Sequence, residues 1–285
     1  MGFKASSSDS SLFVKQDGAD VIILLLYVDD IILTGSSSQK VQEVITELAA
    51  VFELKDIGRL TYFLGLQVQY KVNGDIFVRQ SKYIKDLLHK AMMDSCKPAT
   101  TPCKPHNSLI LNEEEVLADP SLYGSLVGLL QYLTFTRPDI AFAVNLEDQF
   151  MVSPTEMHFG AVKRILRFLQ GTMQLAITFS ANTELGITAF NDSDWAADFL
   201  NTKRSVIGYV VYIGCNPVSW QSKKQSSVSR SSTKAEYKAL AHTVVDVAWI
   251  RAILQDVNAF LPAPPMIYCD NKSAIAISAN PVFHS

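Results

Sequence analysis

Two short apolar runs flank a pair of adjacent aspartates, and this pattern is the strongest constraint on how the chain folds. Residues 21–26 form the first run and residues 31–34 the second. Runs of this length that are closed by turn residues are typical of buried strands. We therefore predict a buried hairpin with Asp29 and Asp30 at its tip.

The aspartate pair has two interpretations. Adjacent carboxylates repel each other, so a pair at the tip of an apolar hairpin is unfavourable unless a cation binds there. Mg²⁺ is a hard ion that takes oxygen ligands and would suit Asp29 and Asp30. The alternative is an exposed acidic turn, because Asp is common in turns for backbone reasons alone. The local pattern leaves both open, although the flanking apolar residues favour burial.

The rest of the first hundred residues alternates strand and helix patterns. A strand at residues 12–15 precedes the hairpin, and the serines at 36–38 can cap a helix that extends to Phe52. Residues 63–68 and 76–78 flank an Asn-Gly turn and predict a second hairpin.

The middle of the chain has the composition of a linker followed by helices. Pro, Thr and Asn gather between Lys97 and Asp119, and Glu113 to Glu115 follow one another in the same stretch. Three helices are predicted after it. One of them is expected to begin with a capping box formed by Ser153 and Glu156.

The last third predicts three antiparallel strands, a helix, a strand and a short helix. The expected ranges are 185–190, 206–213, 217–220, 233–255, 266–269 and 272–279. This order of elements is typical of a mixed α/β layer. Taken as a whole, the sequence predicts an α+β or mixed α/β protein.

Three acidic residues lie at element ends in this last third. Asp192 follows a strand, Glu236 lies in the first turn of a helix, and Asp270 follows a strand. Side chains from different element ends can converge, and two-metal phosphoryl chemistry needs such a cluster to hold ions about 3.5–4 Å apart.

Two members of this set, Glu236 and Asp192, have ordinary alternatives. Thr233 and Glu236 together fit a capping box, which would explain Glu236 without any chemistry. Asp194 is a rival to Asp192, and spacing does not separate the two.

Charge is also distributed unevenly along the chain. Overall, 25 Lys and Arg against 28 Asp and Glu give −3, so the whole chain is not a polycation. Between residues 203 and 238, seven basic residues against Glu236 alone give +6. They are Lys203, Arg204, Lys223, Lys224, Arg230, Lys234 and Lys238. Tyr209, Tyr212 and Trp220 add stacking surfaces, so the stretch is either a nucleic-acid surface or a solvated basic face.

Composition excludes several classes. An apolar fraction of 48% with 19% charged residues excludes wholesale disorder. The four cysteines show no metal-ligand spacing and are expected to be reduced. The longest apolar run, residues 21–28, is far shorter than the roughly 20 residues that cross a bilayer. We therefore expect a soluble, intracellular protein without a membrane partner.

Several motifs in the same order resemble the Pol polyproteins of copia-type LTR retrotransposons. LLLYVDDIILTG, YFLGLQV, YGSLVG and TRPDI are similar to the reverse transcriptase region. DSDWA, SWQSKKQ, SSTKAEY and YCDN are similar to the RNase H domain. The resemblance implies a palm remnant at 1–98, a linker and helical thumb or connection at 99–180, and an RNase H-like domain with a mixed five-stranded sheet at 181–285.

The resemblance also implies roles for single residues. Asp29 and Asp30 would be polymerase-palm metal ligands, and Asp192, Glu236 and Asp270 would be three of the RNase H carboxylates. The expected cofactor is Mg²⁺, with Mn²⁺ as a substitute. The basic stretch would bind an RNA/DNA hybrid, or an RNA template with a DNA primer, in a cytoplasmic particle or the nucleus.

Departures from the family pattern predict impaired activity. The polymerase fingers and a further palm aspartate are expected upstream of this chain, and the fourth RNase H carboxylate just beyond Ser285. Acids at Glu147 and Asp148 replace an expected apolar helix stretch. We therefore expect a reverse transcriptase and RNase H fragment whose polymerase is inactive as an isolated chain. The alternatives are a non-catalytic relic and a hybrid-binding module.

Overall fold

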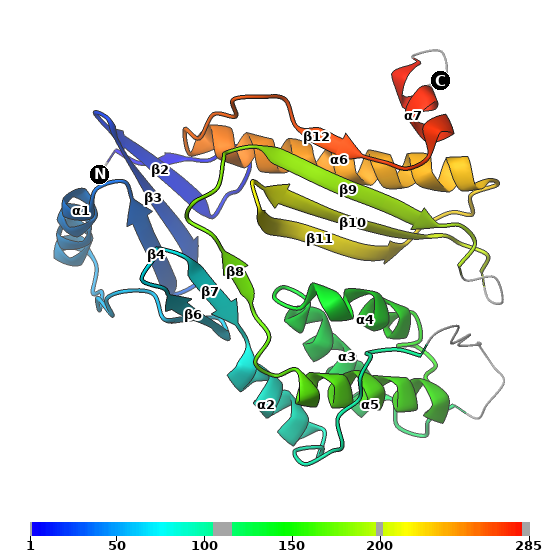
Figure 1. The fold of residues 1–285 in the computed structure, drawn as a ribbon. Helices are drawn as coiled ribbons and strands as arrows, with labels where there is room; N and C mark the ends of the chain where they lie inside the picture. The colour runs from blue at the N-terminus through cyan, green and yellow to red at the C-terminus, as the bar shows by residue number, and fades with distance from the viewer. Residues whose placement is uncertain (1, 105–115, 198–201, 281–285) are drawn as a thin grey trace. The chain divides into compact units, whose positions relative to one another are not determined.

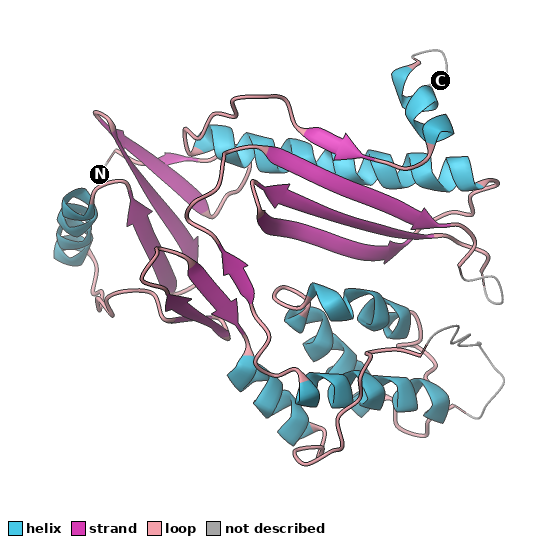
Figure 2. Cartoon of the chain, in the orientation of Figure 1, coloured by secondary structure: helices cyan, strands magenta, loops and turns pink. Residues whose placement is uncertain are grey.

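The computed structural model describes residues 2–104, 116–197 and 202–280, and it is a mixed α+β structure (Figure 1). The described residues form several sheets and seven α-helices, coloured by type in Figure 2. The chain divides into two compact units, residues 1–60 with 244–264 and residues 61–243 with 265–285. None of the described helices combines the length and apolar character that crossing a membrane requires.

The first unit contains a four-stranded antiparallel sheet, one complete helix and the last part, from Val244, of the long helix α6 (Ser232–Asp256). Its elements are β1 (Lys4–Ala5), β2 (Leu12–Asp17), β3 (Asp20–Tyr27), β4 (Asp30–Gly35) and α1 (Ser38–Val51). The strands pair in chain order. The predicted strands and helix are confirmed, and only the two-residue β1 was not expected.

The core of the first unit follows from two periodicities. Alternate residues Ile22 and Leu24 of β3 face the helix, where Val44 and Leu48 lie one turn apart. The Ser37 side chain accepts a hydrogen bond from the Lys40 amide and caps the helix, as the serine run predicted.

The second unit contains a small sheet of four short strands. They are β5 (Tyr62–Phe63), β6 (Leu66–Tyr70), β7 (Ile76–Arg79) and β8 (Ile177–Phe179), all antiparallel. The predicted second hairpin is confirmed as β6 and β7. The prediction of one strand over residues 63–68 is wrong, because Leu64 and Gly65 adopt φ of 48° and 83° and turn the chain between β5 and β6.

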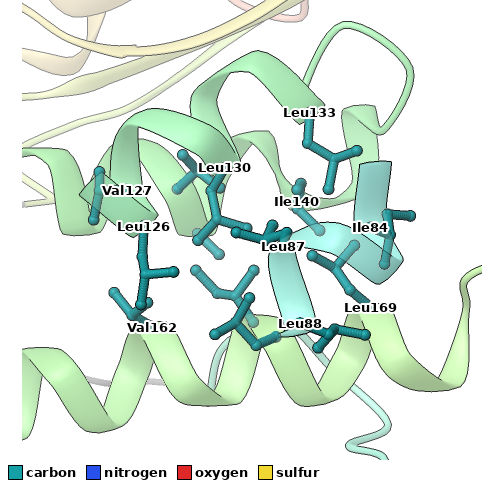
Figure 3. Packing of buried hydrophobic residues seen from close by; sticks show 14 of the residues in the cluster. Ile84, Leu87, Leu88, Leu126, Val127, Leu130, Leu133, Ile140, Val162 and Leu169 are labelled. Atoms are coloured by element: carbon teal, nitrogen blue, oxygen red, sulfur yellow. The ribbon is translucent and has the colours of Figure 1, made fainter. Parts of the chain in front are cut away.

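Five helical elements build the largest apolar core, which also lies in the second unit. They are α2 (Ser81–Lys90), α3 (Ser121–Leu133), the 3₁₀ turn η1 (Pro138–Ile140), α4 (Ala141–Asp148) and α5 (Glu156–Gly171). Figure 3 shows Leu87 and Leu88 of α2 packed among Leu126, Leu130 and Leu169, all at most 2% exposed.

Sequence patterns found most of this helical core. The helices after the linker were predicted and α2 was not. The predicted capping box of Ser153 and Glu156 is wrong, because α5 begins two residues later, with Thr155 and His158 as the box. Residues Glu113 to Glu115 of the predicted linker lie outside the described residues.

The last third forms a second sheet in the second unit. Its elements are β9 (Ile187–Asp194), β10 (Val206–Ile213), β11 (Asn216–Lys224), α6 (Ser232–Asp256), β12 (Met266–Tyr268) and α7 (Lys272–Ala279). The sheet shares this unit with α7 and the part of α6 up to Thr243. The strand order is β11-β10-β9-β12, with β12 parallel to β9 and the other pairs antiparallel. The predicted order of elements is confirmed, but the described sheet has four strands where five were expected, because nothing pairs beyond β12 in the described chain.

A carboxyl group is buried in the helical core. Glu147 of α4 is 2% exposed, and the Tyr123 hydroxyl donates to its carbonyl at 2.7 Å and to its Oε2 at 3.2 Å. Burial raises the pKa of Glu147 to about 8, while the hydrogen bond from Tyr123 opposes this shift. The folded protein therefore holds Glu147 as a neutral acid at pH 7.

This pKa makes stability fall as pH rises. The unfolded chain releases the Glu147 proton near pH 4.5, whereas the folded chain keeps it until about pH 8. Between these values the unfolded state binds fewer protons, which reduces the free energy of unfolding by up to about 5 kcal/mol. We predict that Glu147→Gln removes most of this loss, so that the variant exceeds the wild type in stability at pH 9.

Urea unfolding at pH 5 and pH 9 measures the effect. Glu184→Gln, at an exposed loop position, is the matched control and should follow the wild-type pH dependence. A Glu147→Gln protein that loses stability with pH as steeply as the wild type would contradict the prediction.

Candidate functional site

The structure places the first predicted acidic pair at the tip of the β3–β4 hairpin. Tyr27 pairs with Asp30, so Val28 and Asp29 form the two-residue turn, and Val28 has a φ of 51° that a β-branched residue rarely adopts. Both carboxylates are exposed, and no ion pair of the described residues includes either of them.

The expected burial around this pair is wrong. Leu26 is 42% exposed and Val28 is 80% exposed. The side chains of α1 that reach the sheet, Val44 and Leu48, cluster with Ile22 and Leu24, and the hairpin extends beyond this cluster. Apolar alternation indicates which face of a strand can be buried, but not how far along the strand a helix covers it.

The second predicted acidic set comes together at one end of the β9–β12 sheet. In the parallel pair of β9 and β12, Phe190 lies opposite Tyr268. Asp192 and Asp270 lie two residues beyond this pair, near the carboxyl ends of neighbouring strands. Asp270 follows its strand as predicted, but the prediction that Asp192 follows a strand is wrong, because β9 continues to Asp194 and Asp192 pairs with Gly208 of β10.

Glu236 reaches this end of the sheet from the first turns of α6. The amide of Ser193 donates to Glu236 Oε1 at 3.1 Å and to Asp192 Oδ1 at 2.8 Å, so one N–H orients two carboxylates. Glu236 is 5% exposed, and its second oxygen, Oε2, is buried without a hydrogen-bond partner among the described residues.

These contacts decide two questions that the sequence left open. The capping-box interpretation of Glu236 is wrong, because Ser231 caps α6 by accepting from the Lys234 amide at 3.2 Å, while Glu236 points to the sheet. Asp192 shares the Ser193 amide with Glu236, whereas Asp194 lies two residues further along β9, opposite Val206.

The electrostatics of the cluster favour a cation. The pKa of Glu236 is raised to about 7, mainly by burial. The hydrogen bond from Ser193 lowers it, and interactions with Asp192 and Asp270 contribute to the rise. A carboxyl group held under such repulsion is stabilised by a proton or by a positive ion.

The residues present fit a divalent metal. One ligand atom each from Glu236, Cys269 and Asp270 lie within 4.8 Å of one another. Carboxylate oxygens suit Mg²⁺ or Mn²⁺, and Glu236 Oε2, which has no partner in the described part of the chain, would gain one from the ion. Sequence analysis missed Cys269, and its position directly before Asp270 was the available signal.

The basic stretch lies around the same end of this sheet. Val206 is opposite Asp194 on one side and Lys224 on the other. Lys203 and Arg204 lie two to three residues before Val206, and Lys223 precedes Lys224. The remaining residues, Arg230, Lys234 and Lys238, lie in the loop before α6 and in its first two turns.

Some of these cations already have protein partners. Lys224 Nζ donates to Gln149 Oε1 at 2.8 Å, and Lys238 Nζ donates to Ser227 Oγ at 2.9 Å. Lys223, Arg230 and Lys234 have exposed side chains. A phosphate backbone that approaches this face would therefore meet these three most readily.

The three aromatic residues of the stretch line a cleft. Tyr209, Tyr212 and Trp220 share a cavity of about 610 Å³ with Asp192 and with Phe142 of α4. The Trp220 indole N–H donates to the Thr134 carbonyl at 2.8 Å, so this ring is held in place by the helical core.

Comparison with known proteins identifies the family. The reverse transcriptase (RNA-dependent DNA polymerase) family matches residues 1–105. Over 285 residues the chain is 45% identical to the retrovirus-related Pol polyprotein from transposon RE1 of Arabidopsis thaliana and 43% identical to the one from transposon RE2. All of the chain is covered, and it spans 19% of each polyprotein, about a fifth of their length.

A shorter relative covers most of the chain as well. An uncharacterized mitochondrial protein of Arabidopsis thaliana is 45% identical over 232 residues, which are 80% of this chain and 94% of that protein. No solved structure matches. The chain therefore belongs to the Pol polyproteins of copia-type retrotransposons, and its residues 1–105 belong to their reverse transcriptase domain.

Proposed function

We propose that this chain is the part of a retrotransposon reverse transcriptase that carries an RNase H-type nuclease site, which hydrolyses the RNA strand of an RNA/DNA hybrid with Mg²⁺. The convergence of Asp192, Glu236 and Asp270 from three separate elements carries the proposal. Carboxylates grouped in this way are the donor set of two-metal phosphoryl transfer.

Each residue has a defined part in this proposal. Asp270 and Glu236 would bind the metal with their oxygens, and Asp192 would add a further carboxylate from the adjoining strand. The Ser193 amide fixes the directions of Asp192 and Glu236 before any ligand arrives, which lowers the reorganisation that binding requires. The bound metal would supply charge stabilisation and an activated water.

Basic residues near the acidic cluster indicate a substrate with a phosphate backbone. Lys223, Arg230 and Lys234 lie on the elements that also carry or adjoin the acidic cluster. A phosphate backbone bound to them would neutralise their charges and approach the carboxylates with its scissile group.

We propose that Asp29 and Asp30 are polymerase-palm metal ligands. Their support is the reverse transcriptase match over residues 1–105 and their place at an exposed hairpin tip. Phosphoryl transfer to a primer depends chiefly on the positioning of template and nucleotide. Two carboxylates in an exposed turn do not supply that positioning in the 285-residue chain by itself.

We predict Mg²⁺-dependent cleavage of a labelled RNA/DNA hybrid by the purified chain, and faster cleavage in Mn²⁺. Asp192→Asn, Glu236→Gln and Asp270→Asn should each reduce the rate by roughly 100-fold or more, because a catalytic metal supplies several kcal/mol. Asp194→Asn, two residues along the same strand, is the matched control and should retain the rate.

Two results would contradict this assignment. Cleavage that survives Asp270→Asn would mean that the cluster is not the nuclease site. Absence of cleavage in both metals, with a folded chain, would favour a relic or a hybrid-binding module.

We predict no primer extension by the 285-residue chain on an RNA template with a DNA primer. The measurement is incorporation of labelled deoxynucleotides in Mg²⁺ and in Mn²⁺. Incorporation that disappears in an Asp29→Asn, Asp30→Asn double variant would show that this hairpin suffices for polymerisation and would overturn the prediction.

We predict salt-dependent binding of the hybrid through the basic stretch. Replacing Lys223, Arg230 and Lys234 with Ala should lower the slope of log affinity against log salt by about 2–3, because each phosphate contact releases counterions. Lys85→Ala, at an exposed position of α2, is the control. Fluorescence anisotropy at several salt concentrations measures both, and an unchanged slope in the triple variant would place the interface elsewhere.

A further inference from the structure

Cys269 lies inside the carboxylate cluster, although RNase H-type chemistry as proposed above makes no use of sulfur. In the chain it stands between Tyr268, the last residue of β12, and Asp270. The Cys269 side chain is half-buried, whereas Asp270 is exposed. Its Sγ and one oxygen each from Glu236 and Asp270 lie within 4.8 Å of one another.

A second, independent observation indicates that this cluster takes a ligand. Glu236 is 5% exposed, and its Oε1 accepts a hydrogen bond from the Ser193 amide. The other oxygen, Oε2, is buried without a partner among the described residues. A buried carboxylate oxygen in that position costs free energy unless a proton or a cation satisfies it.

The donor set differs from one built for Mg²⁺. Mg²⁺ demands six oxygen donors, and a sulfur atom beside it contributes nothing to binding. One sulfur and two carboxylate oxygens instead suit a softer ion such as Zn²⁺ or Cd²⁺, which accepts tetrahedral coordination.

The donor atoms lie further apart than in a bound tetrahedral site. Zn–S and Zn–O bonds of about 2.3 and 2.1 Å place the donors roughly 3.6 Å apart. The three ligand atoms are at most 4.8 Å apart, so the cluster needs to contract by about 1 Å. The exposed Asp270 side chain can supply this by changing rotamer.

We propose that Glu236, Cys269 and Asp270 form a binding site for a thiophilic divalent ion, with Zn²⁺ as the expected occupant, and that this ion inhibits the nuclease by displacing Mg²⁺. The binding part stands on the donor set alone. The inhibition part rests on the proposed function, because it uses the same two carboxylates.

Inhibition follows from the shared ligands. An ion held by Cys269 occupies Glu236 and Asp270 and withdraws both oxygens from the hydrated ions that hydrolysis requires. Thiolate coordination makes Zn²⁺ bind far more tightly than Mg²⁺ at this position. Zn²⁺ at low concentration should therefore stop cleavage in the presence of excess Mg²⁺.

The first experiment measures binding without any activity. The full chain is titrated with Cd²⁺, and the thiolate-to-metal charge-transfer absorbance in the ultraviolet is recorded. We expect one equivalent to bind to the wild type and to Cys215→Ser, which changes an exposed cysteine in the turn before β11. Cys269→Ser should lose this absorbance and should bind Zn²⁺ at least about 10-fold more weakly, because it lacks the sulfur donor.

A second measurement uses the wild-type chain alone, so it does not depend on whether a variant folds. In the wild-type chain, Zn²⁺ should slow alkylation of Cys269 by iodoacetamide without slowing that of Cys215, and peptide mass spectrometry resolves the two. Equal alkylation rates with and without Zn²⁺, or an unchanged absorbance in a folded Cys269→Ser protein, would overturn the proposal.

A hybrid-cleavage assay keeps the two proposals apart. If cleavage occurs, Zn²⁺ should inhibit the wild type and Cys215→Ser at least about 10-fold more strongly than Cys269→Ser. Sulfur-dependent metal binding without cleavage would support the proposed metal site and contradict the proposed nuclease activity. Cleavage without sulfur-dependent metal binding would support the nuclease activity and contradict the metal site.

Discussion

The parallel pairing of β12 with β9 is the constraint on which the acidic cluster depends. Only three residue pairs join these strands, and the last of them sets Phe190 against Tyr268. Their rings stack with centroids 5.1 Å apart at an interplanar angle of 15°, which adds a specific contact at the end of a short ladder. A slip of one residue would turn Tyr268 to the opposite face of the sheet, because side chains alternate along a strand, and would move Asp270, two residues later, out of its present register with Asp192.

The cluster combines a buried donor with exposed ones. Glu236 is held at the sheet by the Ser193 amide, whereas Asp192 and Asp270 are exposed. Glu236 is fixed in position and has one oxygen without a partner among the described residues. The exposed carboxylates of Asp192 and Asp270 can change conformation to fit the ion that binds. This division explains how one site can fit an oxygen-only ion and, through Cys269, a softer one.

Sequence patterns predicted where the helices and strands lie better than which of their residues are buried. Apolar runs located β3 and β4, and the helix predicted at residues 272–279 is α7, capped by Asn271. Exposure of the hairpin tip could not be predicted, since strand alternation does not say where the covering helix ends. The cap of α6 was predicted at Thr233, which is wrong by two residues, because Ser231 accepts from the Lys234 amide and Glu236 turns to β9 instead of closing a capping box.

The proposed metal donors could be predicted only in part, for a topological reason. Residues 236 and 269 are 33 positions apart, so no local ligand spacing connects Glu236 with Cys269. Family resemblance supplied the carboxylates, but it gave no reason to single out a cysteine beside one of them. The cysteine joins the cluster because β12 runs parallel to β9 and ends just short of Asp270, so that the turn into α7 carries both Cys269 and Asp270 to Glu236. Strand order therefore determines the donor set, and strand order is the feature that periodicity and spacing specify least.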